Sequence, residues 1–266
     1  MTFSWPDSLA AIARWSAAHR VALNAARLRF VKFSVLDSIA SDAGLSKILI
    51  LRGSAALQLF YGGKRESADM DFVVLNIDGA RNAGDDDAAP KSCLERVLAD
   101  RLPQHFHGDS SWLTWFKSIK IDLTPAARMY DCVRVPMTSG EENASERAVL
   151  VATREVLIAE KLAAISEAIV DQHRKRRAHD VYDIACLLRG SRPHVDVRRI
   201  GQLLRRRTEL EGRRYLVGEF DVVGRKYLTP DYDRLRVELG PDFIPFDEAW
   251  LSLTELVGQV DSQRQP

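Results

Sequence analysis

The stretch LRGSAALQLFYGGKRESADMDFVV, from Leu51 to Val74, decides the fold. Asp69 and Asp71 alternate at the start of an apolar run, so their side chains share one face of a predicted strand. Two like charges on one face repel each other and resist desolvation, which makes the pair costly unless something neutralises it. The pair therefore indicates either a solvent-facing strand end or a site that holds cations.

The residues upstream of the pair suit phosphate binding. Gly53 lets the backbone approach a phosphate closely, and Ser54 adds a hydroxyl donor. The free N–H groups that open the predicted helix, residues 55–61, favour an anion. Asp69 and Asp71 can together hold divalent ions, because hard Mg²⁺ prefers carboxylates combined with phosphate oxygens. In two-metal sites such ions lie ~3.5–4 Å apart and clamp the attacking and leaving oxygens of a displacement.

Gly53-Ser54 followed by Asp69-x-Asp71 resembles the Gly-Ser … Asp-x-Asp signature of nucleotidyltransferases of the DNA polymerase β type. More narrowly, LRGSAALQLFYGG and RESADMDF are similar to segments of the AbiEii/AbiGii toxin family, including its MenT-like relatives. Arg52 is a departure from that pattern, since many relatives have a second glycine there.

Two later segments carry the narrower resemblance further along the chain. LIAEKLAAI contains Lys161, and RRAHDVYDI contains Asp180 and Asp183; both resemble helices of the same family. The resemblance covers residues 45–190, and the tail beyond residue 190 matches only weakly.

The resemblance implies a metal site made of three carboxylates. Asp69 and Asp71 would bind Mg²⁺ or Mn²⁺, and Asp122, in the predicted strand 118–123, would complete the site and accept the proton of the attacking hydroxyl. A lone Asp in an apolar strand needs such a reason. The alternative is that Asp122 caps the turn at Thr124-Pro125.

The resemblance also implies a nucleotide-binding set of six residues: Gly53, Ser54, Arg65, Ser67, Lys161 and Asp183. Lys161 would neutralise the triphosphate as a point charge, and Asp180 would orient Lys161 or the nucleotide. Without the resemblance, Lys161 is an exposed helical lysine, and Asp180 pairs with Arg176 or Arg177.

The implied function is a metal-dependent nucleotidyltransferase that moves a nucleoside monophosphate from an NTP to an acceptor. The family implies a toxin of a type IV-like toxin–antitoxin or phage-defence system, with an AbiEi-like antitoxin. MenT-like relatives imply the 3′ end of tRNA as acceptor, so that translation is blocked. Two alternatives remain: transfer to a protein or small-molecule hydroxyl, and a non-catalytic nucleotide-binding module.

The hydrophobic pattern predicts an α/β (α+β) fold in two parts. Residues 1–150 form N-terminal helices and a mixed sheet, and residues 151–266 are mainly helical. The resemblance implies that the first part is a nucleotidyltransferase domain of the polymerase β type and that the second contributes to the active-site cleft. The predicted strands are 47–51, 69–75, 112–116, 118–123, 132–137 and 148–152. The predicted helices are 8–43 with a break, 55–61, 92–102, 154–169 capped by Thr153, 178–188, 197–211 and 246–260.

Composition excludes several classes of protein. The 266 residues carry a net charge of +1, so any basic surface is local. The three cysteines are scattered without CxxC spacing, which argues against zinc and disulfides. No signal peptide or membrane helix is expected, which indicates a cytoplasmic protein. The basic runs 174–177, 205–207 and 213–214 are either solvated or contact RNA phosphates.

Overall fold

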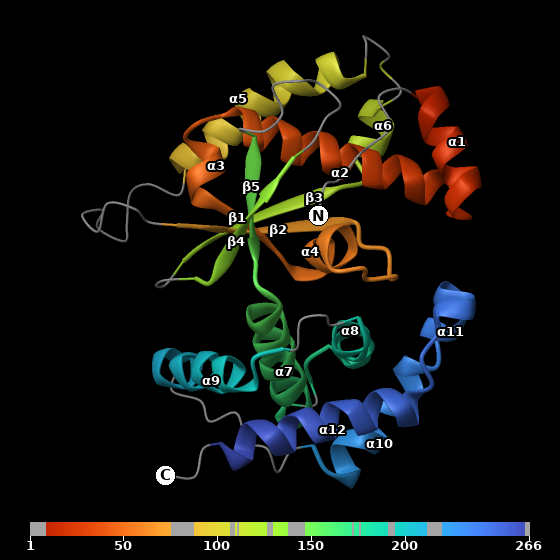
Figure 1. The fold of residues 1–266 in the computed structure, drawn as a ribbon, viewed down its shortest axis with the longest axis vertical. Helices are drawn as coiled ribbons and strands as arrows, with labels where there is room; N and C mark the ends of the chain where they lie inside the picture. The colour runs from red at the N-terminus through yellow and green to blue at the C-terminus, as the bar shows by residue number, and fades with distance from the viewer. Residues whose placement is uncertain are drawn as a thin grey trace. The chain divides into compact units, whose positions relative to one another are not determined.

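A computed structural model describes residues 9–75, 88–106, 110, 112–126, 130–137, 147–171, 173–175, 177–190, 195–211 and 220–263 (Figure 1). The chain divides into two compact units. The sheet unit comprises Met1–Ala56 and Glu66–Ala152, and the helical unit comprises Leu57–Arg65 and Thr153–Pro266. Arg176 and the basic run 213–214 lie outside the described residues.

The sheet unit contains a five-stranded mixed sheet in the order β3-β2-β1-β5-β4. Central β1 pairs antiparallel with β2 and parallel with β5; β2 pairs parallel with β3, and β5 pairs antiparallel with β4. This arrangement confirms the predicted α/β class. The strands are β1 (Leu49–Arg52), β2 (Asp69–Val74), β3 (Lys120–Pro125), β4 (Cys132–Pro136) and β5 (Ala148–Ala152).

Helices cover one face of this sheet (Figure 1). Helix α2 packs on β5, and three other helices, α1, α5 and α6, pack against α2. On β2, Met70 and Phe72 are fully buried, and burial of such a side chain stabilises the fold by about 1.5–3 kcal/mol. The helices of this unit are α1 (Leu9–His19), α2 (Leu23–Ser41), α3 (Leu45–Ile48), the start of α4 (Gly53–Phe60), α5 (Ala88–His105) and α6 (Trp112–Phe116).

Two predictions in the sheet unit are wrong in detail. The segment Trp112–Phe116, predicted as a strand, is helix α6. The period of a short apolar run does not distinguish a helix from a strand. In the helix, the ring of Trp115 packs edge to face on the ring of Phe106, with 6.3 Å between the ring centroids. The strand predicted from residue 47 starts at Leu49, because residues 45–48 form α3.

The helical unit is built around α7 and α8. Helix α7 (Arg154–Val170) packs against α8 (Ala178–Arg189) and α9 (Val197–Glu211), and α12 (Phe246–Ser262) packs against α8 and α9. The predicted cap is confirmed, since the Thr153 side chain accepts a hydrogen bond from the Val156 N–H. The sequence analysis missed α10 (Val222–Tyr232), α11 (Leu235–Leu239) and the 3₁₀ turn Gly240–Asp242.

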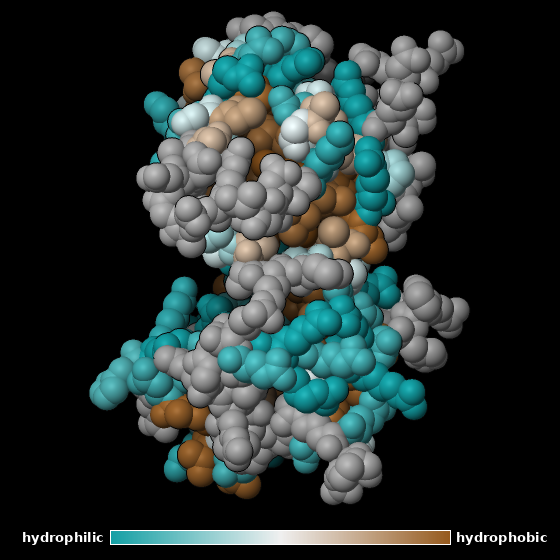
Figure 2. Space-filling view, turned by 90° about the vertical axis from the view of Figure 1, so that its left-hand side faces the viewer, coloured by the Kyte–Doolittle hydropathy of each residue, from teal (hydrophilic) through white to brown (hydrophobic). Residues whose placement is uncertain are grey.

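The surface of the helical unit is mainly hydrophilic on the face that Figure 2 shows, with apolar residues in small patches. Its exposed apolar side chains include Val170, Val222, Val223 and Val237. None of the helices in the described ranges has the length and apolarity needed to span a bilayer.

Candidate active site

Three carboxylates lie on one face of the sheet. In the register of β2 and β3, Asp71 is the neighbour of Asp122, and Asp69 is the neighbour of Lys120. Because in-register neighbours and residues two apart along a strand share a face, Asp69, Asp71 and Asp122 point to the same side. This set, called the carboxylate face below, lies opposite the side occupied by Met70.

Lys120 is a cation of this face. Its Nζ lies 2.6 Å from Oδ2 of Asp122, and both side chains are well exposed, at 69% and 42%. The hydrogen bond and charge of Asp122 raise the pKa of Lys120, and the charges of Asp69 and Asp71 raise it further. One ammonium therefore offsets part of the charge of three carboxylates. Asp122 is placed beside Asp71 in the sheet, which is where a third carboxylate was expected.

Gly53 lies against the carboxylate of Asp71. A Cβ built on Gly53 would fall 2.4 Å from Oδ2 of Asp71, and the φ of Gly53 is +68°. Only glycine fits both the close approach and the left-handed backbone without strain. The turn from β1 into α4 thus brings Gly53 and the half-buried Ser54 beside the acids of β2.

The donor chemistry of the carboxylate face fits a divalent cation. Within the described part of the chain, no three His, Cys, Asp or Glu side chains are already gathered as ligands. Mg²⁺ is commonly held by one or two carboxylates together with substrate phosphates, rather than by a complete protein cage. Asp69 and Asp71, with Asp122 one strand away, supply hard oxygen donors of that kind.

The segment that enters β2 is held by the buried Lys32 of α2, a contact that the sequence analysis missed. Lys32 Nζ donates to the backbone carbonyl of Ser67, and the Ser67 hydroxyl accepts from the N–H of Asp69 at 3.3 Å. Arg29, one turn earlier on α2, donates from Nε to Glu66 at 3.1 Å. Two cations of α2 therefore fix the approach to the carboxylate face.

Burial perturbs Lys32 strongly. Desolvation is the largest effect and lowers the pKa of Lys32 to about 8. The negative charges of Glu66 and Asp69 raise this pKa, and the positive charge of Arg29 lowers it, but none of them outweighs burial. A signal for this residue was available in the sequence, because Lys32 interrupts the apolar run from Phe30 to Leu36. A lysine on a buried helical face needs a partner.

In the helical unit, Lys161 joins two buried aspartates. Its Nζ lies 2.6 Å from Oδ1 of Asp180 and 2.7 Å from Oδ2 of Asp183. Arg65 donates from Nη2 to Asp183 Oδ2 at 3.0 Å. The Nε of Arg177 lies 3.0 Å from Asp180 Oδ2 but makes no hydrogen bond to it. These five residues form the lysine cluster, in which Lys161 is buried and not exposed on its helix.

The charges of the lysine cluster support one another. Burial alone would lower the pKa of Lys161, but Asp180 and Asp183 outweigh burial and raise it. Burial likewise would raise the pKa of Asp183, but Lys161 and Arg65 lower it to about 2. Desolvation lowers the pKa of the adjacent His179 to about 4, so this imidazole is neutral at pH 7. With three cations and two anions, the cluster carries one net positive charge.

A family model matches most of the chain. The model described as "Nucleotidyl transferase AbiEii toxin, Type IV TA system" matches residues 34–250. The chain belongs to the AbiEii nucleotidyl transferase toxin family. This is a family of nucleotidyltransferase toxins from type IV toxin–antitoxin systems, so the chain is a nucleotidyltransferase, and the alternative of a non-catalytic module is set aside. The family gives an NTP as substrate and an antitoxin as partner.

Other comparisons add little. A crystal structure assigned as a nucleotidyltransferase from H. pylori is 17% identical, over 89% of this chain and 95% of that chain, with a TM-score of 0.39. At that TM-score the similarity carries no inference. No curated protein matches the chain significantly.

Proposed function

We propose that this toxin transfers a nucleoside monophosphate from an NTP to the 3′ end of tRNA in a reaction that depends on Mg²⁺ or Mn²⁺. The observation that carries the proposal is the carboxylate face, on which Asp69, Asp71 and Asp122 share one side beside Gly53. Lys120 pairs with Asp122 on this face, and a divalent cation would neutralise further negative charge there. A tRNA modified at its acceptor end would block translation in the cytoplasm, and an AbiEi-like antitoxin would oppose the toxin.

Each residue has a defined part in the proposed reaction. Asp69 and Asp71, with Asp122, would hold the divalent cation, which supplies charge neutralisation and orientation of the triphosphate. The backbone at Gly53 and the Ser54 hydroxyl would bind phosphate oxygens, as helix N-termini do. Ser67 fixes the backbone of Asp69. From the helical unit, Lys161 and Arg65 would add positive charge, while Asp180 and Asp183 orient them.

The transfer is a single displacement. The terminal hydroxyl oxygen of the RNA attacks the α-phosphorus of the NTP, and a new P–O bond forms. The bond from that phosphorus to the bridging oxygen of the β-phosphate breaks, and pyrophosphate leaves. Asp122 would accept the hydroxyl proton, since its carboxylate is exposed and lies beside Asp71.

The test uses the full chain with Mg²⁺, total tRNA and each of the four NTPs labelled on the α-phosphate. The wild type and Asp247→Ala are expected to label tRNA, because Asp247 is an exposed acid on α12 that pairs with Arg225. Asp69→Ala and EDTA treatment are expected to abolish labelling. Equal labelling by the wild type and Asp69→Ala would refute the catalytic assignment, and label found only on protein or small molecules would refute the tRNA acceptor.

A further inference from the structure

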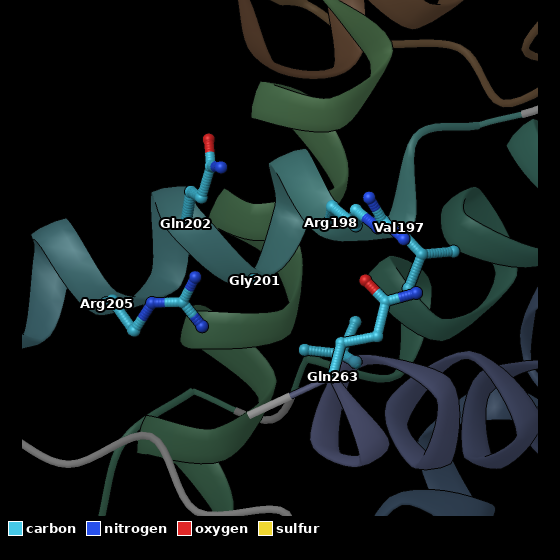
Figure 3. Close-up of a pocket in the computed structure, with 7 residues that line it drawn as sticks. Val197, Arg198, Gly201, Gln202, Arg205 and Gln263 are labelled. Carbon is cyan, nitrogen blue, oxygen red and sulfur yellow. The ribbon is translucent and has the colours of Figure 1, made fainter. Parts of the chain in front are cut away.

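A hollow of about 290 Å³ lies between α9 and α12, inside the helical unit (Figure 3). Five of its residues lie on α9 at helical spacings of three or four, so they form one stripe of that helix. Exposed Arg198 and Arg205 stand seven residues apart, about 10 Å along the axis. The hollow is lined by Val197, Arg198, Gly201, Gln202, Arg205, Val260 and Gln263.

The two arginines of the hollow differ from Arg199 and Arg207 of the same helix. Arg207 pairs with Glu167, and Arg199 donates to the Gln202 side chain at 2.9 Å. Within the described ranges, neither Arg198 nor Arg205 has an ion-pair or hydrogen-bond partner, and no acidic residue lines the hollow. Its lining thus presents two uncompensated guanidinium groups.

The amide side chains of the hollow add neutral donors. Because the Gln202 oxygen accepts from Arg199, its NH₂ group remains as a donor. Gln263 extends from the end of α12 at the other side (Figure 3). Guanidinium and amide donors are the usual contacts to phosphate and sugar oxygens in nucleic-acid complexes. Among the residues that the structure describes, no aromatic ring lines the hollow to stack a base, so the chemistry fits contacts to a nucleic-acid backbone.

We propose that the α9–α12 hollow is a docking site for the phosphodiester backbone of the RNA acceptor. Arg198 and Arg205 bind separate phosphates of one strand, and the amides contact neighbouring oxygens. This proposal rests on the proposed function in that RNA is taken as the acceptor. It adds a second, sequence-independent contact that holds the acceptor by its backbone, apart from the residues assigned to the reaction.

The direct test measures binding of fluorescently labelled tRNA by anisotropy, with no NTP present, over a range of NaCl concentrations. Arg198→Gln/Arg205→Gln is compared with Arg225→Gln/Arg234→Gln, which removes the same charge from two exposed arginines that already have acidic partners. The Arg198→Gln/Arg205→Gln variant, called the pocket variant below, is expected to bind tRNA at least about tenfold more weakly than the wild type. Its slope of log affinity against log salt should fall by about 2, one for each phosphate contact. The control should keep the wild-type slope.

A kinetic readout separates this site from the catalytic assignment. In transfer of a labelled nucleotide to tRNA, the pocket variant should show a raised KM for tRNA and an unchanged kcat. If the wild type transfers to tRNA and the pocket variant matches the control in affinity, salt slope and KM, the docking site is refuted while the proposed function stands. If the wild type binds tRNA through Arg198 and Arg205 but labels no RNA, the docking site stands and the proposed acceptor is refuted. If the wild type does not bind tRNA, both fall.

Discussion

The carboxylate face and the lysine cluster are both groups of charges, but they are neutralised in opposite ways. On the carboxylate face, Asp69, Asp71 and Asp122 share one side, and the exposed Lys120 pairs with Asp122. In the lysine cluster, two buried acids are matched by three cations at 2.6–3.0 Å. The proposed function gives the first group a divalent cation to bind, whereas the acids of the second group are paired with cations of the protein itself. The difference predicts that changes to the first affect activity and changes to the second affect stability as well.

The lysine cluster also limits what Lys161 can give to a substrate. Its ammonium already donates to Asp180 and Asp183, so Lys161 is not an isolated point charge. The cluster therefore acts as one unit, in which the aspartates hold Lys161 and Arg65 in fixed positions.

The largest expected effect is on activity, from Asp71→Asn. Loss of one anionic ligand should lower nucleotidyl transfer by at least about 10³-fold, equivalent to ~4 kcal/mol of transition-state stabilisation. The free energy of unfolding should stay within about 0.5 kcal/mol of wild type or rise, because a like-charge repulsion is removed. Both quantities are measured on the same preparation, by labelling and urea unfolding, with Asp247→Asn as the matched control. A large loss of stability would show that Asp71 is structural.

Lys161→Ala should reduce stability together with activity. Removing one partner of a buried ion pair leaves uncompensated charge and costs roughly 3–5 kcal/mol. We expect about 3 kcal/mol, because Arg65 and Arg177 remain beside the two aspartates. Urea unfolding measures the loss against Lys226→Ala, which removes an exposed lysine of α10. Wild-type stability in Lys161→Ala would contradict a self-neutralised cluster.

Lys32 gives a test by pH. The pKa of Lys32 is about 8 in the folded state, against an ordinary value of 10.5. Between pH 8 and pH 10.5 the unfolded chain therefore binds more protons at Lys32 than the folded chain does, and the free energy of unfolding rises with pH. Wild type should therefore gain about 2 kcal/mol relative to Lys32→Met between pH 7.5 and pH 10. Chemical unfolding of both proteins at the two pH values measures this difference. A constant difference would mean that Lys32 titrates normally.

The smallest effect is expected from Gly53→Ala. A left-handed backbone costs a residue other than glycine about 1–2 kcal/mol, and the new methyl group would press on Asp71. Transfer activity should fall through displacement of that carboxylate. Gly258→Ala, whose Cβ meets nothing within 4 Å, controls for the change of residue. Full activity in Gly53→Ala would show that the close approach to Asp71 is unimportant.

Local patterns were enough to predict most of the fold. Asp69 and Asp71 indicated strand β2 because they alternate before an apolar run, and Thr153 indicated the start of α7. The strand predicted for Trp112–Phe116 was wrong because five apolar residues fit either period. Helix α10 was missed, although Asp221 caps its N-terminus, because Pro230 and scattered polar residues hide its apolar stripe.

The contacts of the candidate site could not be predicted as well from the sequence, because they join distant parts of the chain. Arg65 reaches Asp183 across 118 residues, and Lys32 reaches Ser67 across 35. No periodicity encodes such pairs. The family resemblance pointed to Arg65 and Asp183 one by one, but their pairing emerges only when the chain is folded. Lys32 was missed altogether, since its role depends on burial.

In the proposed reaction, the carboxylate face binds a divalent cation through Asp69 and Asp71. Titration of Mn²⁺ into the full chain with a non-hydrolysable NTP analogue, followed by electron paramagnetic resonance of free Mn²⁺, tests this without turnover. Wild type and Asp247→Asn should bind Mn²⁺, and Asp69→Asn/Asp71→Asn should lose at least about tenfold in affinity. Equal affinity of the double variant and the wild type would contradict the account.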